Sequence, residues 1–427
     1  MSTVTGDTAV LDALRAATGG EARLAGPGDE IDGVAPTFVV APAGTAEAAE
    51  VMRIAAAREL AVVPSGTGTK LAWGAPPARA DLLVRTHRMN RVIEHGAGDL
   101  VVHAEAGVTL PALGEHLAPA RQRLALDPVL PPGTTSAGTV GGVIATAVSG
   151  PLRLSHGAPR DLLIGITMVR ADGMVAKAGG KVVKNVAGYD LGKLLTGSWG
   201  TLGLITEAVF RLHPLPALAR WVVAPARTPA ETYDLVRRLI HAQVVPTALE
   251  IDQPADSAGT LAVALEGIPE GVDGRVARVL ELLGEGARVS ENAPDWWGRA
   301  PWEGGDVALR LTHEIAGLPR LLDAFAETAR RHGLRVAVRG SAGVGVLHGV
   351  LSGVPDADPA GVAAVVTELR EQAAAWSGDV VVLDAPPPVK AAVDVWGPVR
   401  GLHLMRRVKD QFDPGHRLAP GRFVGGI

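Results

Sequence analysis

Near its start the chain alternates between apolar positions with helical spacing and short apolar runs. The spacing predicts one helix over residues 7–18 and another over 45–60, with Thr45 as the N-cap of the second. Apolar runs at 37–40 and 61–64 predict strands on either side of the second helix. This order predicts a βαβ unit whose second strand leads directly into a glycine-rich loop.

From residue 81 onward the apolar runs are short and separated by turn residues, which predicts a second, mostly antiparallel layer. The predicted strands are 82–84, 100–104, 162–170, 174–178 and 204–212. Two prolines within 212–216 end the last strand and mark the best domain boundary in the chain.

After this boundary strands alternate with helices, which favours an α+β domain of two βαβ-like halves. The predicted strands are 220–224, 260–266, 306–312, 335–338 and 344–350, and the predicted helices are 228–241, 272–285, 317–332 and 359–377. Three consecutive prolines at 386–388 close the domain, and a helix-like segment over 399–412 leads to the tail.

Composition narrows the function classes. The chain has 427 residues, enough for two or three domains, and its 41 basic against 45 acidic residues include no basic block suited to nucleic acid. It has no cysteine, which excludes disulfides, thiol nucleophiles and an iron–sulfur cluster held by this chain. Without a secretory pattern or an apolar stretch of membrane-spanning length, we expect a cytoplasmic protein with no transmembrane segment, which partner subunits could hold at a membrane.

The loop Ser65–Lys70 consists of small and hydroxyl-bearing residues ahead of a lysine. Such a loop can bring successive backbone N–H groups close to a pyrophosphate. It is neither a Walker A loop nor a dinucleotide fingerprint, because Leu71 stands where each motif needs another residue. Taken alone, an ordinary turn remains the favoured interpretation.

The segment 127–150 favours a bound ligand over an ordinary turn. Between Gly133 and Gly150 almost no residue has a large side chain, yet the segment is too apolar for a solvated linker. This composition predicts that a flat ring system or a long cofactor lies against it. The predicted hydrogen-bond donors are Thr139, Ser149 and the N–H groups of Gly141 and Gly142. A glycine–alanine helix packed closely on another helix is the alternative.

A third glycine cluster, at 197, 200 and 203, precedes a strand. The backbone of Leu204 and Ile205 would there offer hydrogen-bonding edges to a base. Three such clusters in one domain-sized region indicate a single extended ligand.

With these clusters in order, the chain resembles the vanillyl-alcohol oxidase family of PCMH-type FAD-binding proteins, and within it the FAD-binding chains of glycolate-oxidase type. The resemblance covers roughly residues 30–215 and the tail. Its motifs are Pro64–Lys70, Gly138–Gly142, Lys181–Leu191, Gly197–Glu207, Asp413–Gly415 and Pro420–Arg422.

The implied fold is α+β: a PCMH-type FAD-binding domain of two α+β subdomains, with a ferredoxin-like α+β cap domain. The implied divisions are an N-terminal helical extension (1–30), the FAD-binding domain (31–216), the cap (217–395) and a C-terminal segment that returns to the FAD domain (396–427).

The resemblance also implies the cofactor site. The first loop would wrap the pyrophosphate, the second segment would lie along the flavin and ribityl chain, and Gly203–Ile205 would hold the adenine end. The implied cofactor-binding residues are Pro64, Ser65, Gly66, Thr67, Gly68, Thr69, Lys70, Gly138, Thr139, Gly141, Gly142, Ser149, Gly150, Gly203, Leu204 and Ile205. Because the first loop has no histidine or cysteine, we expect FAD to be bound non-covalently. His156 falls near a flavin-facing family position, with a loop histidine as the alternative.

Departures from the family bear on the chemistry. Related 2-hydroxy-acid dehydrogenases carry a cap motif whose histidines and acid bind a metal and the substrate, but here Ser341, Val344 and Val346 occupy it. We therefore predict no metal and find no obvious group for an α-hydroxy carboxylate. His348 remains as a candidate base, although an ordinary strand histidine is the favoured interpretation. Trp199 and Ala419 also replace family residues.

The resulting expectation is an FAD-dependent oxidoreductase, the FAD-binding subunit of a glycolate-oxidase-like complex that acts on glycolate or another 2-hydroxy acid. Its expected partners are a catalytic flavin subunit and an iron–sulfur subunit. Two alternatives stay open: a self-sufficient oxidase or dehydrogenase for an alcohol or sugar acid, and a structural subunit that has lost the flavin. The tryptophans at 296, 297 and 302 predict an interface or a cap core.

Overall fold

The computed structural model describes every residue except 1, 135, 137, 182–188, 256 and 354–357. Part of the Lys181–Leu191 motif therefore lies outside the described residues. The N-terminal layer contains α1 (Ser2–Ala17), β1 (Ala22–Leu24), β2 (Phe38–Val40), α2 (Thr45–Ala57), β3 (Val62–Ser65) and β4 (Leu82–Arg85). Its strands lie in the order β1-β2-β4-β3, and β2 and β3 each pair in parallel with β4. The predicted βαβ elements are present, with β4 inserted between the two strands.

The second layer is a sheet of order β5-β6-β10-β8-β9, and its pairing is antiparallel as predicted. Its strands are β5 (Val92–Gly96), β6 (Val101–Glu105), β8 (Leu163–Val169), β9 (Val175–Gly179) and β10 (Leu204–Arg211). The assignment of 82–84 to this layer was wrong, because that strand is β4 and pairs in parallel with β2 and β3 in the first sheet. Strand β5 was not predicted. Short helices surround the second layer: α3 (Leu110–Leu117), α4 (Val140–Thr146), α5 (Arg153–His156), α6 (Pro159–Leu162) and α7 (Leu191–Leu195).

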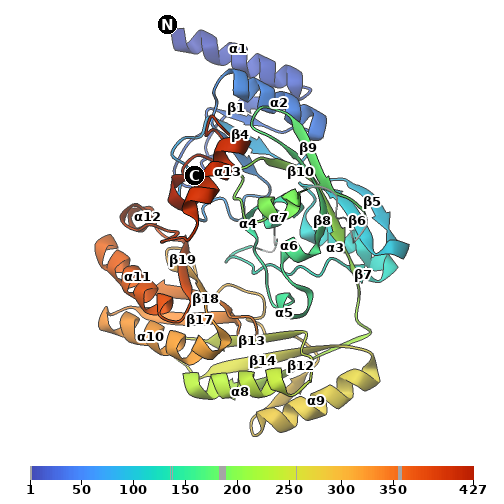
Figure 1. Cartoon of the computed structure of the whole chain (residues 1–427), viewed down its shortest axis with the longest axis vertical. Helices are drawn as coiled ribbons and strands as arrows, with labels where there is room; N and C mark the ends of the chain where they lie inside the picture. The colour runs from blue at the N-terminus through green and yellow to red at the C-terminus, as the bar shows by residue number, and fades with distance from the viewer. Residues whose placement is uncertain (1, 135, 137, 182–188, 256, 354–357) are drawn as a thin grey trace.

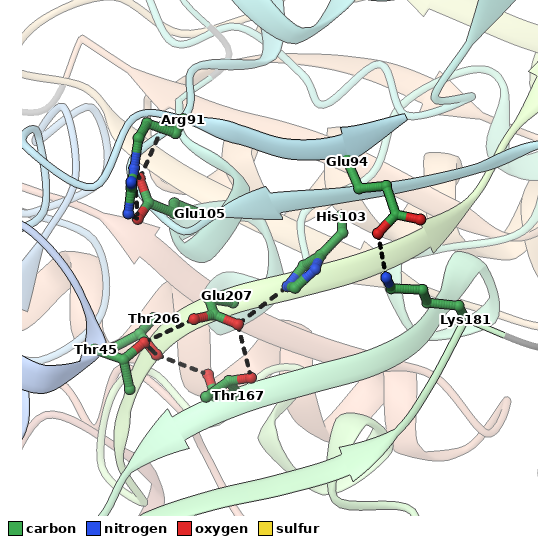
Figure 2. A network of polar contacts seen from close by, with 9 residues as sticks. All are labelled: Thr45, Arg91, Glu94, His103, Glu105, Thr167, Lys181, Thr206 and Glu207. Carbon is green, nitrogen blue, oxygen red and sulfur yellow. Dashed lines mark hydrogen bonds and ion pairs between the residues drawn. The ribbon is translucent and has the colours of Figure 1, made fainter. Parts of the chain in front are cut away.

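A half-buried carboxylate joins the two layers (Figure 2). Glu207 on β10 accepts hydrogen bonds from Thr45 at the start of α2 (2.9 Å) and Thr167 on β8 (3.1 Å), and contacts Nε2 of His103 on β6 (3.0 Å). Burial alone would raise the pKa of Glu207, but these hydrogen bonds lower it, so it is anionic at neutral pH. The network fixes β10 relative to α2, the helix that leads into β3.

The third sheet has eight strands in the order β15-β12-β14-β13-β17-β18-β16-β19. Each half repeats one βαββαβ unit of ferredoxin-like order. The first half comprises β12 (Leu218–Ala226), α8 (Pro229–His241), β13 (Ala248–Gln253), β14 (Gly259–Gly267), α9 (Pro269–Leu283) and β15 (Arg288–Ser290). The second comprises β16 (Val307–Thr312), α10 (Leu318–Arg331), β17 (Arg335–Ser341), β18 (Val346–Ser352), α11 (Pro359–Ala374) and β19 (Asp379–Asp384). Antiparallel pairing of β13 with β17 joins the halves.

Helices α8–α11 cover one face of this sheet (Figure 1). Apolar side chains of these helices and of the sheet form one extensive hydrophobic cluster. The opposite face meets the FAD-domain elements: the hydroxyl of Ser155 on α5 donates to the carbonyl of Thr247 (2.9 Å). The sequence patterns did not predict β13 and β15 of the first unit or β19 of the second. The predicted α+β cap with ferredoxin-like order is otherwise present.

The C-terminal residues run back to the first layer. After α12 (Pro387–Ala392), helix α13 (Leu402–Phe412) leads to a tail in which Leu418 forms a parallel bridge with Val62 of β3. The two-stranded sheet β7 (Gln122–Arg123) with β11 (His213–Pro214) lies where the chain enters the cap. None of the helices in the described residues is long and apolar enough to cross a membrane.

Candidate functional site

The glycine loop lies at the carboxyl end of β3 and forms one wall of a cleft of about 810 Å³. Within the part of the chain that the structure describes, the backbone N–H groups of Gly66, Thr67, Gly68 and Thr69 have no hydrogen-bond acceptor. Unpaired, successive N–H groups beside a cleft can bind an anion.

The second wall is the start of α4. Thr139 is its N-cap and accepts a hydrogen bond from the N–H of Gly142 (3.2 Å). A Cβ on Gly66 would lie 2.3 Å from the Thr139 hydroxyl, and a Cβ on Gly141 would lie 2.8 Å from that of Ala106. Gly66 therefore allows the loop to approach Thr139 of the second wall, and Gly141 allows α4 to pack closely on Ala106.

The third wall is the start of β10, preceded by a strained turn. Trp199 has a positive φ of 56° and is buried against Trp396, with ring centroids 4.9 Å apart. A buried lysine holds this turn: Nζ of Lys409 donates to the carbonyl of Thr201 (2.8 Å) and to Oδ2 of Asp413 (2.8 Å). The C-terminal helix thus positions the strand that borders the cleft.

The structure brings all the predicted cofactor-binding residues to this one cleft except Ser149 and Gly150. The hydroxyl of Ser149 instead accepts a hydrogen bond from Arg153 (3.3 Å). A Cβ on Gly150 would lie 1.8 Å from the carbonyl oxygen of Asp127, so backbone packing alone requires this glycine. No histidine is among the cleft-lining residues that the structure describes, and His156 instead lies beside His213, with 4.5 Å between the ring centroids.

Sequence reasoning missed several cleft residues. They are Val63, Leu71, Thr86, Ala106, Ala145, Thr146, Trp199, Gly200 and Arg422. Only Arg422 is charged, and its sole sequence signal was the Pro420–Arg422 motif. Burial lowers its pKa to about 10, with the charge of Asp32 acting in the opposite direction, so it is cationic at neutral pH.

Lys70 is the other cation of the cleft. It is 9% exposed, and burial lowers its pKa to about 8. Its ammonium group lies 5.6 Å from the ring centroid of Trp73, which contacts Trp302 of the cap (6.0 Å between centroids). These rings connect the cleft to the cap sheet.

Trp302 also contacts the cap sheet at His348. His348 lies 5.7 Å from Trp302 and faces Arg310 across the pairing of β18 with β16. Burial, followed by the charge of Arg310, lowers the pKa of His348 to about 4, so it is neutral at pH 7. The Nε atom of Arg310 is buried with no hydrogen-bond partner in the described residues. Burial and then the charge of Arg153 lower the pKa of Arg310, while the charge of Asp379 acts in the opposite direction.

The predicted tryptophan patch divides between two environments. Trp302 is buried in the apolar cluster of the cap. Trp297 contacts Trp221 of β12 and Trp296 lies under the guanidinium of Arg339, 5.8 Å from its ring centroid. Among the residues described, no group of three or more histidine and carboxylate side chains could hold a metal ion.

Comparison with known proteins agrees with this geometry. Residues 36–179 match the family described as FAD binding domain. This match lies in the part of the chain that contains most of the cleft-lining residues. The whole chain superposes on the solved structure of p-cresol methylhydroxylase with a TM-score of 0.73, at 18% identity, over 98% of this chain and 96% of that one. The resemblance to PCMH-type proteins, the fold and FAD as the cofactor are therefore confirmed.

Two curated relatives add to this comparison. The chain is 27% identical to glycolate oxidase subunit GlcD of Bacillus subtilis over 420 residues, covering 91% of this chain and 88% of the relative. It is 36% identical to glycolate oxidase subunit GlcE of Escherichia coli over 155 residues, covering 36% of this chain and 43% of the relative. These similarities confirm the prediction that the chain is an FAD-dependent oxidoreductase.

Proposed function

We propose that this chain is the FAD-binding subunit of a glycolate-oxidase-like complex that oxidises a small 2-hydroxy acid. The observation that carries the proposal is the cleft, in which the unpaired N–H groups of the glycine loop and the cation of Lys70 face the N-cap region of α4. In this assignment the loop binds the pyrophosphate, the Thr139–Gly142 wall lies along the ribityl chain, and Gly203–Ile205 holds the adenine end. Similarity to both glycolate oxidase subunits supports the complex.

The cap supplies groups suited to the substrate. A 2-hydroxy acid carries a carboxylate, and Arg310 could bind it, because the buried Nε atom of Arg310 has no hydrogen-bond partner among the described residues. The neutral ring of His348 beside Arg310 could accept the hydroxyl proton. These groups do not need the metal that the family motif would bind.

Bound FAD would supply the acceptor for the two electrons and the hydrogen that leave the hydroxyl-bearing carbon. The chain has no cysteine and so cannot hold an iron–sulfur cluster for the next transfer. We therefore propose that electrons leave to a catalytic flavin subunit and an iron–sulfur subunit. The complex would be cytoplasmic.

The test begins with the chain purified alone. It should show flavin absorbance, or gain it on reconstitution with FAD. A protein that stays colourless after reconstitution would contradict the proposal and favour a structural subunit that has lost its flavin.

The second measurement adds glycolate or D-lactate together with an artificial electron-accepting dye. Turnover by the isolated chain would favour the self-sufficient oxidase, whereas activity only with the partner subunits would support the complex. In whichever preparation turns over, the isolated chain or the complex, Arg310→Met should raise the KM for the 2-hydroxy acid about tenfold or more. The reason is that a charge-assisted hydrogen bond to the substrate carboxylate is lost. Exposed Arg320→Met, on the far side of the cap sheet, is the matched control.

A further inference from the structure

The backbone that follows the glycine loop is held by the C-terminal part of the chain. Nη2 of Arg422 donates to the carbonyls of Leu71 (2.9 Å) and Trp73 (2.8 Å). Lys390 donates to the carbonyl between them, that of Ala72. The loop's approach to the cleft is therefore set by two buried cations distant from it in sequence.

The two cations differ in their ion pairs. Lys390 is paired with Asp32 and with Asp384, both at 2.9 Å. Arg422 forms no ion pair with a carboxylate in the described part of the chain, although its side chain is only 4% exposed. Its Nη1 atom is buried and has no hydrogen-bond acceptor there. Leaving a charged donor buried and unpaired is costly, so a missing anionic partner is the simplest explanation.

The position of Arg422 indicates what that partner is. Arg422 lines the same cleft as Ser65–Lys70, and its guanidinium is fixed by carbonyls of the residues that directly follow this loop. The group expected at the loop is the pyrophosphate of FAD, which carries two negative charges. Lys70 and Arg422 are the two cations among the described cleft-lining residues.

We propose that Arg422 is a second cationic ligand of the FAD pyrophosphate, so that the C-terminal tail completes the cofactor site. The proposal rests on the assignment of the glycine loop to the pyrophosphate. Hydrogen bonds to the rest of the protein hold the tail in this position. The N–H of Ala419 donates to the carbonyl of Val62 (2.8 Å), and the indole of Trp396 donates to the carbonyl of Arg422 (3.0 Å).

The test compares FAD with riboflavin, which has the same ring system and no phosphate. Arg422→Gln retains amide N–H donors for the two loop carbonyls and removes the charge. We expect it to raise the Kd for FAD about tenfold to a hundredfold and to change the Kd for riboflavin less than about twofold. Arg422→Lys, which keeps the charge, should bind FAD with an intermediate Kd. Exposed Arg406→Gln, also in the C-terminal segment, is the matched control and should leave both unchanged.

Ionic strength gives a second measurement that a purely structural role would not change. Salt screens charge interactions, so the Kd of the wild-type protein for FAD should rise with salt more steeply than that of Arg422→Gln. An equal salt dependence, or an equal loss of FAD and riboflavin binding, would overturn the proposal and leave Arg422 a structural residue. A wild-type chain that does not bind FAD would instead refute the cofactor site itself.

Discussion

The buried lysine of the cleft makes FAD affinity depend on pH. Burial lowers the pKa of Lys70 from its ordinary value of 10.5 to about 8. A pyrophosphate bound beside the ammonium group would favour the charged form and raise that pKa again. Below pH 8 the lysine is protonated both with and without FAD, so the Kd is flat. Above pH 8 binding must take up a proton, so affinity falls as the pH rises.

The magnitude follows from the two pKa values. If the bound form returns to 10.5, the Kd rises about 25- to 30-fold between pH 7 and pH 9.5, which corresponds to about 2 kcal/mol. The rise approaches tenfold per pH unit and levels off above the pKa of the bound form. Quenching of FAD fluorescence on titration with the protein would measure it.

Two variants isolate the lysine from other titrating groups. Lys70→Arg stays charged throughout this range, so its Kd should not change with pH. Lys70→Met should bind FAD more weakly at pH 7 and should also show no such rise. A wild-type Kd that stays constant from pH 7 to 9.5, with Lys70→Met binding equally well, would refute the assignment of Lys70 to the pyrophosphate.

Two further predictions address the loop and its support. Gly68 has a φ of +79°, and no other residue would lie within 4 Å of a Cβ added there, so Asn and Asp should both be tolerated. Gly68→Asp should nevertheless bind FAD about tenfold more weakly than Gly68→Asn, because a carboxylate repels the pyrophosphate; equal Kd values would place the phosphates elsewhere. Lys409→Met leaves the fully buried Asp413 without its cation and should lower the free energy of unfolding by about 3–5 kcal/mol in denaturant titrations. Adding Asp413→Asn should restore part of that loss, and no recovery would contradict a charge effect.

The cleft could be predicted from the sequence because its glycine-rich motifs are short, contiguous segments of the chain. Gly66 lacks a side chain where the loop meets Thr139, and Gly141 lacks one where α4 meets Ala106, and such requirements concentrate glycines in short motifs. The same signal also misleads. Gly150 is required by the carbonyl of Asp127 and not by a cleft-facing position, and composition does not distinguish backbone packing from ligand packing.

Other features depend on contacts distant in sequence. Strand β13 was missed because Glu250 and Asp252 interrupt its apolar pattern, yet both are buried. Desolvation raises the pKa of Glu250, and Asp252 pairs with Arg339 of β17 (2.8 Å), so only the tertiary structure compensates for these acids. Arg310 was missed for the same reason, since its position beside His348 follows from the pairing of β16 with β18.

The positions of four cations suggest how the FAD-binding domain and the cap could bind cofactor and substrate next to each other. Lys70 and Arg422 lie at the glycine loop, while Arg310 lies on β16 of the cap and Arg153 begins α5. A folded protein keeps such charges buried only where something compensates them. The pyrophosphate and the substrate carboxylate are anions of the right kind for the two places. The contacts from Trp73 through Trp302 to His348 join these places, so the cap can position an acid relative to the cofactor that the first domain holds.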